Sequence, residues 1–158
     1  MSPLLRRPAA TNPVHAITPA DAGWRYVGFE LHDLPPGAQL AATPEGREVC
    51  IVLITGTARV TAGGTDFGVI GGRSDVFEGS PWSVYVPPGM AYTVQAGTAC
   101  EVALCSAPAQ GGKPARLIHP DEVGQETRGQ GTNTRSVRNI LPDTVPHAES
   151  LLVVEVIR

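Results

Sequence analysis

The side chains best suited to binding a metal ion are scattered along this sequence. The four histidines stand singly, and no pair shows the H-x-H or H-x-x-x-H spacing that brings two imidazoles to one ion. We expect each of them at the surface or in a turn; they are His15, His32, His119 and His147. The histidine pattern therefore predicts no metal site in this chain.

Nucleotide-binding loops are also excluded by local sequence. The glycines of residues 63–72 lie in a predicted hairpin, and no helix follows them to hold a phosphate at its N-terminus. Gly112 and Lys113 lack the rest of a P-loop, because Ala107 replaces its first glycine and Pro114 its hydroxyl residue. The chain also has no G-x-S-x-G segment for a nucleophilic serine.

The three cysteines lie in apolar, strand-like segments and form no C-x-x-C pair; they are Cys50, Cys100 and Cys105. A free cysteine commonly packs as a small hydrophobic residue. We therefore expect buried, reduced thiols and no disulfide framework.

Charge and composition narrow the possible partners. The 158 residues include 12 basic and 15 acidic side chains, for a net charge of −3, and the basic ones form no stripe. This pattern predicts neither a nucleic-acid partner nor a membrane partner. The chain has no long apolar stretch and no apolar leader in its first residues, so we expect a cytoplasmic protein.

Short apolar segments separated by Gly and Pro turns predict an all-β domain with few or no helices. The strand-like segments are residues 26–31, 49–54, 58–61, 82–86, 92–95, 100–105 and 151–157. Residues 57–70 predict a hairpin most clearly, because Gly63 and Gly64 suit the positive φ angles of a tight turn.

Three further segments are expected outside these strands. Residues 106–114 and 124–135 are polar, glycine-rich connectors, and residues 119–124 predict one short helical turn. The apolar strand at residues 151–157 needs a partner. Three partners are open from the sequence: the same domain, another subunit, or further protein that follows this strand.

Two spacings of Gly and Pro match the motifs of small cupin-type β-barrels. The first runs from Gly37 to Gly56, and the second is the P-x-G-x-x-Y segment at residues 87–92. Metal-binding cupins carry three histidines and a glutamate at four positions in these motifs. Here those positions hold Thr43, Glu45, Val49 and Tyr92.

These four side chains do not make a metal site. Divalent metals need several imidazole, thiolate or carboxylate donors that converge on one point, and only Glu45 offers one. The neighbouring Glu48 should face the opposite side of its strand, because side chains alternate. A register shift by one residue would restore only one ligand of four, so the prediction of no metal stands.

Longer strings carry a more specific resemblance. The chain resembles the 5-deoxyglucuronate isomerase family of bacterial inositol catabolism over nearly its whole length. The matching strings lie at residues 23–30, 76–79, 85–89, 111–118, 129–135 and 137–141.

The resemblance implies a double-stranded β-helix of the cupin type, present as the first half of a two-cupin enzyme. It implies a metal-free cupin at residues 1–123, and a linker and first strand toward an absent second cupin at residues 124–158. The family interconverts 5-deoxyglucuronate and 2-deoxy-5-keto-gluconate. It carries its divalent metal in the second cupin, so we expect no cofactor in this chain.

Two groups of residues are therefore candidate sites. Thr43, Glu45, Val49 and Tyr92 would line a vestigial pocket, and Glu45 with Tyr92 could bind a hydroxylated ligand or simply fill the space. Arg135, Arg138 and Asn139 could reach a substrate carboxylate or bridge the two cupins, since arginine suits carboxylates. Trp24 with Arg25 would stack on and clamp a sugar, or anchor an interface.

Three functions remain open from the sequence. The leading one is the non-metal half of the isomerase, inactive alone. The alternatives are a non-catalytic module that binds a small sugar acid, and an oligomerisation scaffold that buries the C-terminal strand. A small sugar acid and a second copy of the chain, in a homo-oligomer, are the expected partners.

Overall fold

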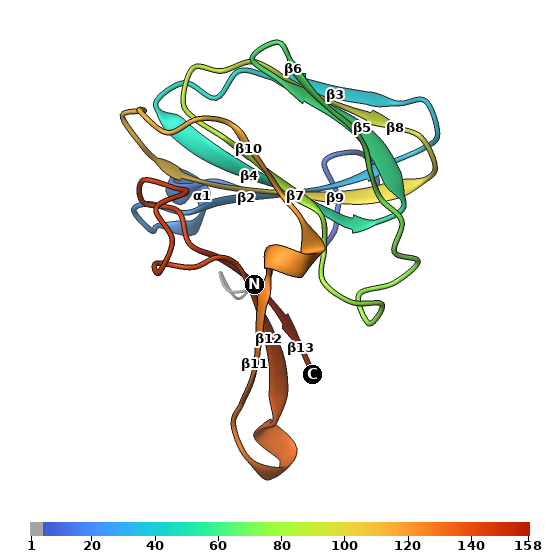
Figure 1. Ribbon diagram of the computed structural model, residues 1–158, viewed down its shortest axis with the longest axis vertical. Helices are drawn as coiled ribbons and strands as arrows, with labels where there is room; N and C mark the ends of the chain where they lie inside the picture. Colours follow the sequence, from blue (N-terminus) through green and yellow to red (C-terminus); the bar gives the residue numbers. More distant parts are fainter. Residues whose placement is uncertain (1–4) are drawn as a thin grey trace.

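The longest strand, β4 (Arg47–Thr55), shows how the sheets are layered. Its odd-numbered residues Val49, Ile51 and Leu53 pack into one buried apolar cluster, and Cys50 and Val52 pack into a second cluster on the opposite face. A strand with two buried faces must lie between two layers. In the computed structural model, which describes residues 5–158, a second sheet faces β4 on one side (Figure 1), and residues that include Ile140, Leu141 and Leu151 cover its other side.

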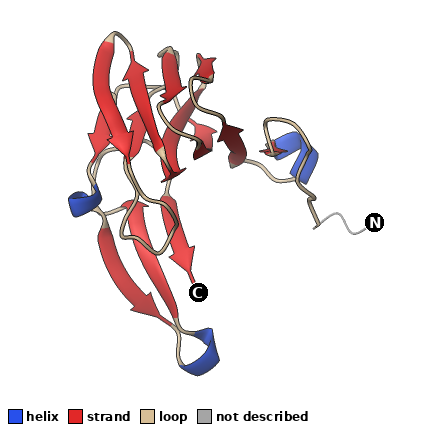
Figure 2. Cartoon of the chain, turned by 90° about the vertical axis from the view of Figure 1, so that its right-hand side faces the viewer, coloured by secondary structure: helices blue, strands red, loops and turns tan. Residues whose placement is uncertain are grey.

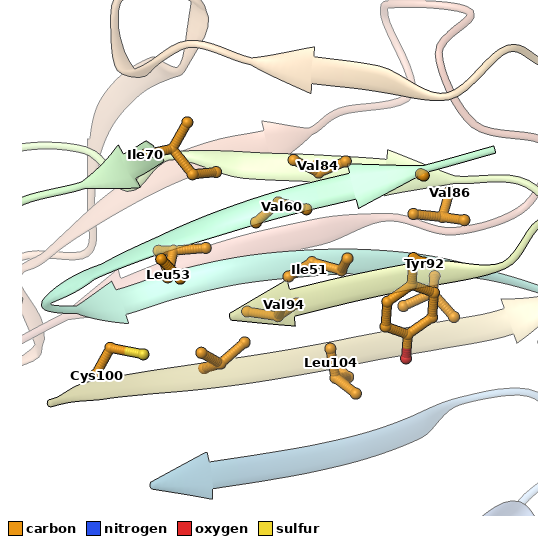
Figure 3. Close-up of a cluster of buried hydrophobic side chains, with 14 of the residues drawn as sticks. Ile51, Leu53, Val60, Ile70, Val84, Val86, Tyr92, Val94, Cys100 and Leu104 are labelled. Carbon is orange, nitrogen blue, oxygen red and sulfur yellow. The ribbon is translucent and has the colours of Figure 1, made fainter. Parts of the chain in front are cut away.

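Two antiparallel sheets face each other and enclose the first cluster (Figure 1). The larger sheet has the order β1-β2-β9-β4-β7-β10, with β1 (His15–Ile17), β2 (Gly28–Leu34), β7 (Ser83–Val86), β9 (Cys100–Pro108) and β10 (Arg116–Ile118) around β4. The smaller sheet has the order β3-β8-β5-β6, formed by β3 (Gln39–Ala42), β5 (Thr57–Ala62), β6 (Thr65–Gly71) and β8 (Tyr92–Ala96). The prediction of an all-β fold is confirmed. Figure 3 shows the aliphatic side chains between the sheets.

A third sheet projects away from the other two (Figures 1 and 2). It has the order β11-β12-β13, with β11 (Gly124–Arg128), β12 (Arg135–Leu141) and β13 (Val153–Ile157). The predicted connector at residues 124–135 is therefore wrong in its first five residues, which form a strand. All five are exposed, so no apolar alternation marks them in the sequence. The predicted connector at residues 106–114 likewise begins too early, because β9 continues to Pro108.

The helices are few and short: α1 (Pro19–Ala22), η1 (Pro120–Glu122) and η2 (Gly131–Asn133). The helical turn η1 confirms the one predicted at residues 119–124. The helix α1 was not predicted, although Thr18 caps it by accepting a hydrogen bond from the Asp21 amide. No helix within residues 5–158 is long and apolar enough to cross a membrane.

The predicted hairpin is also confirmed, and the predicted burial of the thiols is confirmed for two of the three cysteines. Ala62 pairs with Thr65, and the turn between them places Gly63 and Gly64 at φ angles of 56° and 83°. Cys50 and Cys100 are buried, Cys105 is half-buried, and all three are free thiols.

A buried carboxylate fastens the segment before β13 to the larger sheet. Glu48 is fully buried and accepts a hydrogen bond from the Tyr85 hydroxyl at 2.6 Å. It also accepts hydrogen bonds from the backbone amides of Glu149, Ser150 and Leu151, at 2.8, 2.7 and 2.6 Å. The sequence predicted that Glu48 lies on the face of β4 opposite to Val49, and this is confirmed.

A buried ion network makes a second fastening. The carboxylate of Glu155 on β13 lies 2.8 Å from Nη2 of Arg73 and 2.8 Å from Nη1 of Arg138. Arg73 also donates to the backbone carbonyls of Ile54 and Gly79. The third sheet is thus tied to the rest of the molecule by buried polar groups as well as by the second apolar cluster.

Candidate functional site

A cavity of about 350 Å³ opens between the two facing sheets, and we refer to it as the cup. Its wall is formed by residues of β2, β4 and β9 from the larger sheet and by Ala42 and Tyr92 from the smaller one. The start of α1 closes one side. Its polar side chains are those of Thr18, Glu30, Arg47, Tyr92 and Ser106.

Strand alternation explains why these side chains meet in the cup. Arg47 is in phase with Val49 and the inward-facing residues of β4, and Glu30 is in phase with Gly28 on β2. Gly28 leaves room for this packing. A Cβ atom there would lie 2.6 Å from Ser106 Oγ and 3.2 Å from Arg47 Nη2, so these two side chains would have to shift.

Arg47 lines the cup and is held by several hydrogen bonds. Its Nη2 donates to the Tyr26 carbonyl at 2.6 Å and to the Ser106 carbonyl at 3.0 Å, and its Nε donates to Ser106 Oγ at 3.2 Å. Its Nη1 has no hydrogen-bond partner within residues 5–158. The guanidinium is therefore fixed in orientation with one donor group to spare.

Tyr92 forms the opposite wall. Its side chain lies between the sheets beside Leu104 (Figure 3) and is only 4% exposed. Burial and the nearby Glu30 carboxylate raise the pKa of Tyr92 to about 12, so the phenol is neutral near pH 7. Its hydroxyl forms no hydrogen bond with any residue from 5 to 158.

One histidine is buried. His32 lies on β2, and its Nε2 lies 2.8 Å from Oε2 of Glu30. The expectation of a surface or turn position is therefore wrong for His32, because it is in phase with Leu34, which packs into the first apolar cluster.

The structure brings together two of the four predicted pocket residues. Val49 and Tyr92 line the cup. Thr43 and Glu45 are exposed in the connection between β3 and β4 and do not line it. The reason is local, because Glu45 and Gly46 form a turn just before β4 begins.

This donor set does not fit a divalent metal. Val49 offers a hydrocarbon, Tyr92 offers a neutral phenol, and the one carboxylate, that of Glu45, lies outside the cup. Within residues 5–158 no three His, Cys, Asp or Glu side chains are grouped so that they could hold a metal ion.

The other predicted group lies on β12, away from the cup. Arg138 is buried and engaged with Glu155 and with the Val76 carbonyl, which is 2.6 Å away. Arg135 donates to Asn133 Oδ1 at 3.0 Å, and Asn139 donates to Glu126 Oε1 at 3.0 Å. None of the three lines the cup, and Trp24 with Arg25 lies exposed outside it.

Arg47, Glu30 and Thr18 were missed by the sequence-based prediction. Two of them could have been found from strand alternation, because residues two positions apart face the same side of a strand. Arg47 lies two residues before Val49, and Glu30 lies two residues after Gly28. Thr18 had only its capping position before Pro19.

Comparisons with known proteins agree on one family. The KduI/IolB family matches residues 4–158. A 5-deoxy-glucuronate isomerase of Geobacillus kaustophilus is 50% identical over 141 residues, which cover 89% of this chain and 51% of the relative. One from Halalkalibacterium halodurans is 44% identical over 163 residues, covering 99% and 60%. The chain therefore spans about half the length of the curated relatives it matches.

Solved structures support the same conclusion. An IolB-like protein of Salmonella typhimurium superposes with a TM-score of 0.89 at 46% identity, covering 94% of this chain and 56% of the other. The Ylba protein of E. coli shares the fold alone, with a TM-score of 0.58 at 18% identity over 82% of this chain and 49% of the other. The predicted cupin-type fold and the predicted family resemblance are both confirmed. The chain belongs to the KduI/IolB family.

Proposed function

We propose that this chain supplies the first, metal-free cupin of a 5-deoxyglucuronate isomerase. The observation that carries the proposal is how much of each chain the match covers. Relatives named 5-deoxy-glucuronate isomerase are 40–50% identical over 89–99% of this chain, yet the chain covers only 51–60% of them. The remainder of such a protein is where we place the divalent metal.

The chemistry of the cup supports the proposal that the metal lies in the rest of the protein and not in this chain. Conversion of the aldehyde 5-deoxyglucuronate to the ketone 2-deoxy-5-keto-gluconate needs an electrophile on the carbonyl oxygen and a base that moves a proton between carbons. Of the four residues at the motif positions, two lie in the cup: the hydrocarbon Val49 and the neutral phenol Tyr92. We therefore assign no isomerisation step to this cup.

Metal binding by the purified chain tests the proposal. After incubation with zinc, manganese or nickel salts and dialysis, elemental analysis is expected to find far less than one ion per chain, because the motif positions lack converging donors. A chain with Glu45→Ala serves as the matched control and is expected to behave identically.

Stoichiometric metal that a chelator removes would contradict the proposal. Loss of that metal in the Glu45→Ala chain would place it at the motif positions, whereas its retention would place it elsewhere in the protein.

A further inference from the structure

Two cysteines face each other across the centre of the larger sheet. Cys50 on β4 is the register partner of Cys105 on β9. Directly opposed residues of an antiparallel pair place their side chains on the same face of the sheet. Both thiols accordingly pack with the second apolar cluster, where Cys50 is fully buried and Cys105 is half-buried.

The hydrogen bonds between β4 and β9 determine how far apart the two residues lie. The Ala109 amide donates to the Gly46 carbonyl at 3.1 Å, and hydrogen-bonded pairs recur at every second position of an antiparallel ladder. Cys50 and Cys105, four positions further along, therefore form a hydrogen-bonded pair, whereas Pro108, which has no amide hydrogen, falls between such pairs. The Cα atoms of a hydrogen-bonded pair lie about 5.5 Å apart, within the range of roughly 4.4–6.8 Å found for disulfides.

A cavity of about 270 Å³ gives small molecules a route to one of these thiols. It opens between the larger sheet and the third sheet, and its lining includes Cys105 but not Cys50. Its volume is several times the roughly 30 Å³ that a water molecule occupies in the liquid, so a small hydroperoxide fits. Cys105 is therefore the thiol that an oxidant reaches first, and Cys50 is the neighbour that can react with the product.

We propose that Cys50 and Cys105 form a peroxide-sensitive dithiol, which a hydroperoxide oxidises to an intrachain disulfide. The sulfur of Cys105 attacks one peroxide oxygen, the O–O bond breaks, and the other oxygen leaves with a proton as water or an alcohol. The sulfur of Cys50 then displaces the hydroxyl group of the Cys105 sulfenic acid, which leaves with the Cys50 proton as water. Together the two thiols lose two electrons and two protons, and the hydroperoxide gains two electrons. This chemistry goes beyond the isomerase role, to which neither thiol is assigned.

Burial should make this oxidation slower than that of an exposed thiol. It raises the pKa of Cys105 to about 11 and raises the pKa of Cys50 well above its ordinary value. The thiolate is the nucleophile, and only a small fraction of either side chain is thiolate near pH 7. The experiment is therefore carried out in mildly alkaline buffer with hydrogen peroxide in excess.

Peptide mass spectrometry of the folded 158-residue chain after this treatment tests the proposal. Remaining thiols are blocked with N-ethylmaleimide, and digestion with trypsin and Glu-C, which cleaves after Glu101, places Cys100 and Cys105 on separate peptides. We expect a cross-linked pair of peptides that contain Cys50 and Cys105 and together lack two hydrogen atoms. Dithiothreitol should separate the pair.

Single-cysteine variants test the order of the two steps. Cys50→Ser should stop the reaction at the sulfenic acid of Cys105, which dimedone traps. Cys105→Ser should leave Cys50 as a thiol, because Cys50 does not line the cavity. Cys100→Ser is the matched control and should form the disulfide as before, because Cys100 packs into the first apolar cluster on the opposite face of β9. Circular dichroism establishes that each variant is folded.

The unaltered chain alone can overturn the proposal. A disulfide that involves Cys100, a disulfide formed mainly between two chains, or thiols that stay unoxidised until urea unfolds the chain would each contradict it. Such a failure would leave the isomerase assignment untouched, since none of these measurements detects turnover.

Discussion

Replacement of Glu48 by glutamine is expected to lower the free energy of unfolding by about 3 kcal/mol. The carboxylate of Glu48 receives the Tyr85 hydroxyl and three backbone amides, all at 2.6–2.8 Å. An amide side chain keeps one acceptor oxygen but turns its NH₂ group toward these donors. Buried donors left without an acceptor cost about 1–3 kcal/mol each. Urea denaturation monitored by circular dichroism measures the loss.

The pH dependence of the free energy of unfolding gives a second test of the contribution of Glu48. Burial would raise the pKa of Glu48, but the hydrogen bonds from Tyr85 and residues 149–151 outweigh it and hold the pKa below its ordinary value. A depressed carboxyl pKa stabilises the folded state above the unfolded pKa, about 4.3, and this stabilisation disappears as the pH falls through the folded pKa.

Unfolding of the unaltered chain should therefore become easier below about pH 4, and the Glu48→Gln chain should lack this component. Tyr85→Phe is the matched control, because it removes a single hydrogen bond and should cost about 1 kcal/mol. Equal urea midpoints for the unaltered and Glu48→Gln chains would show that Glu48 does not fasten the segment before β13.

Replacement of Glu155 by alanine is expected to have an effect of similar size, about 3–5 kcal/mol. Its side chain is 12% exposed, and those of Arg73 and Arg138 are 5% and 9% exposed. Removal of the carboxylate leaves two buried guanidinium groups without their counter-charge. Breaking a buried ion pair from one side is costly for this reason. Urea denaturation again measures the change.

An exposed ion pair in the same sheet provides the control. Glu126 pairs with Arg128 at 2.5 Å in the exposed strand β11. Its replacement by alanine should change the free energy of unfolding by less than about 1 kcal/mol, the usual range for surface pairs. Similar losses for Glu126→Ala and Glu155→Ala would contradict the importance of the buried network.

The strands around the core could be predicted because their residues alternate or form short apolar runs. The segments at 49–54, 58–61 and 100–105 became β4, β5 and β9 with modest extensions at their ends. The strand β11 escaped prediction because it is polar on both faces. A strand of this kind forms only because β12 offers it a partner.

The buried polar contacts could not be predicted for a different reason. Glu48 lies more than 100 residues along the chain from the amides that donate hydrogen bonds to it, and Arg73 lies 82 residues from Glu155. Contacts this distant leave no local pattern. In the cup, motif spacing identified Val49 and Tyr92, but it directed attention to Glu45 in the turn rather than to Arg47, two residues further on.

Among the expectations from the sequence that stay predictions, two concern how the chain is organised and assembled. One is the boundary between a cupin at residues 1–123 and a linker at residues 124–158. The second apolar cluster contains residues from both parts, including Cys50 and Leu141. The other is the homo-oligomer, for which the exposed Leu152, Val154 and Val156 near the sheet edge at β13 offer an apolar surface.

Turnover of 5-deoxyglucuronate by the 158-residue chain tests the central claim most directly. The reaction is followed by NMR of the sugar carbons, with the intact Geobacillus kaustophilus relative, of which this chain covers 51%, as the positive control. We predict chelator-sensitive turnover by the relative and none by this chain, even with added divalent metal. Formation of 2-deoxy-5-keto-gluconate by this chain alone, lost when a chelator is added, would contradict the account.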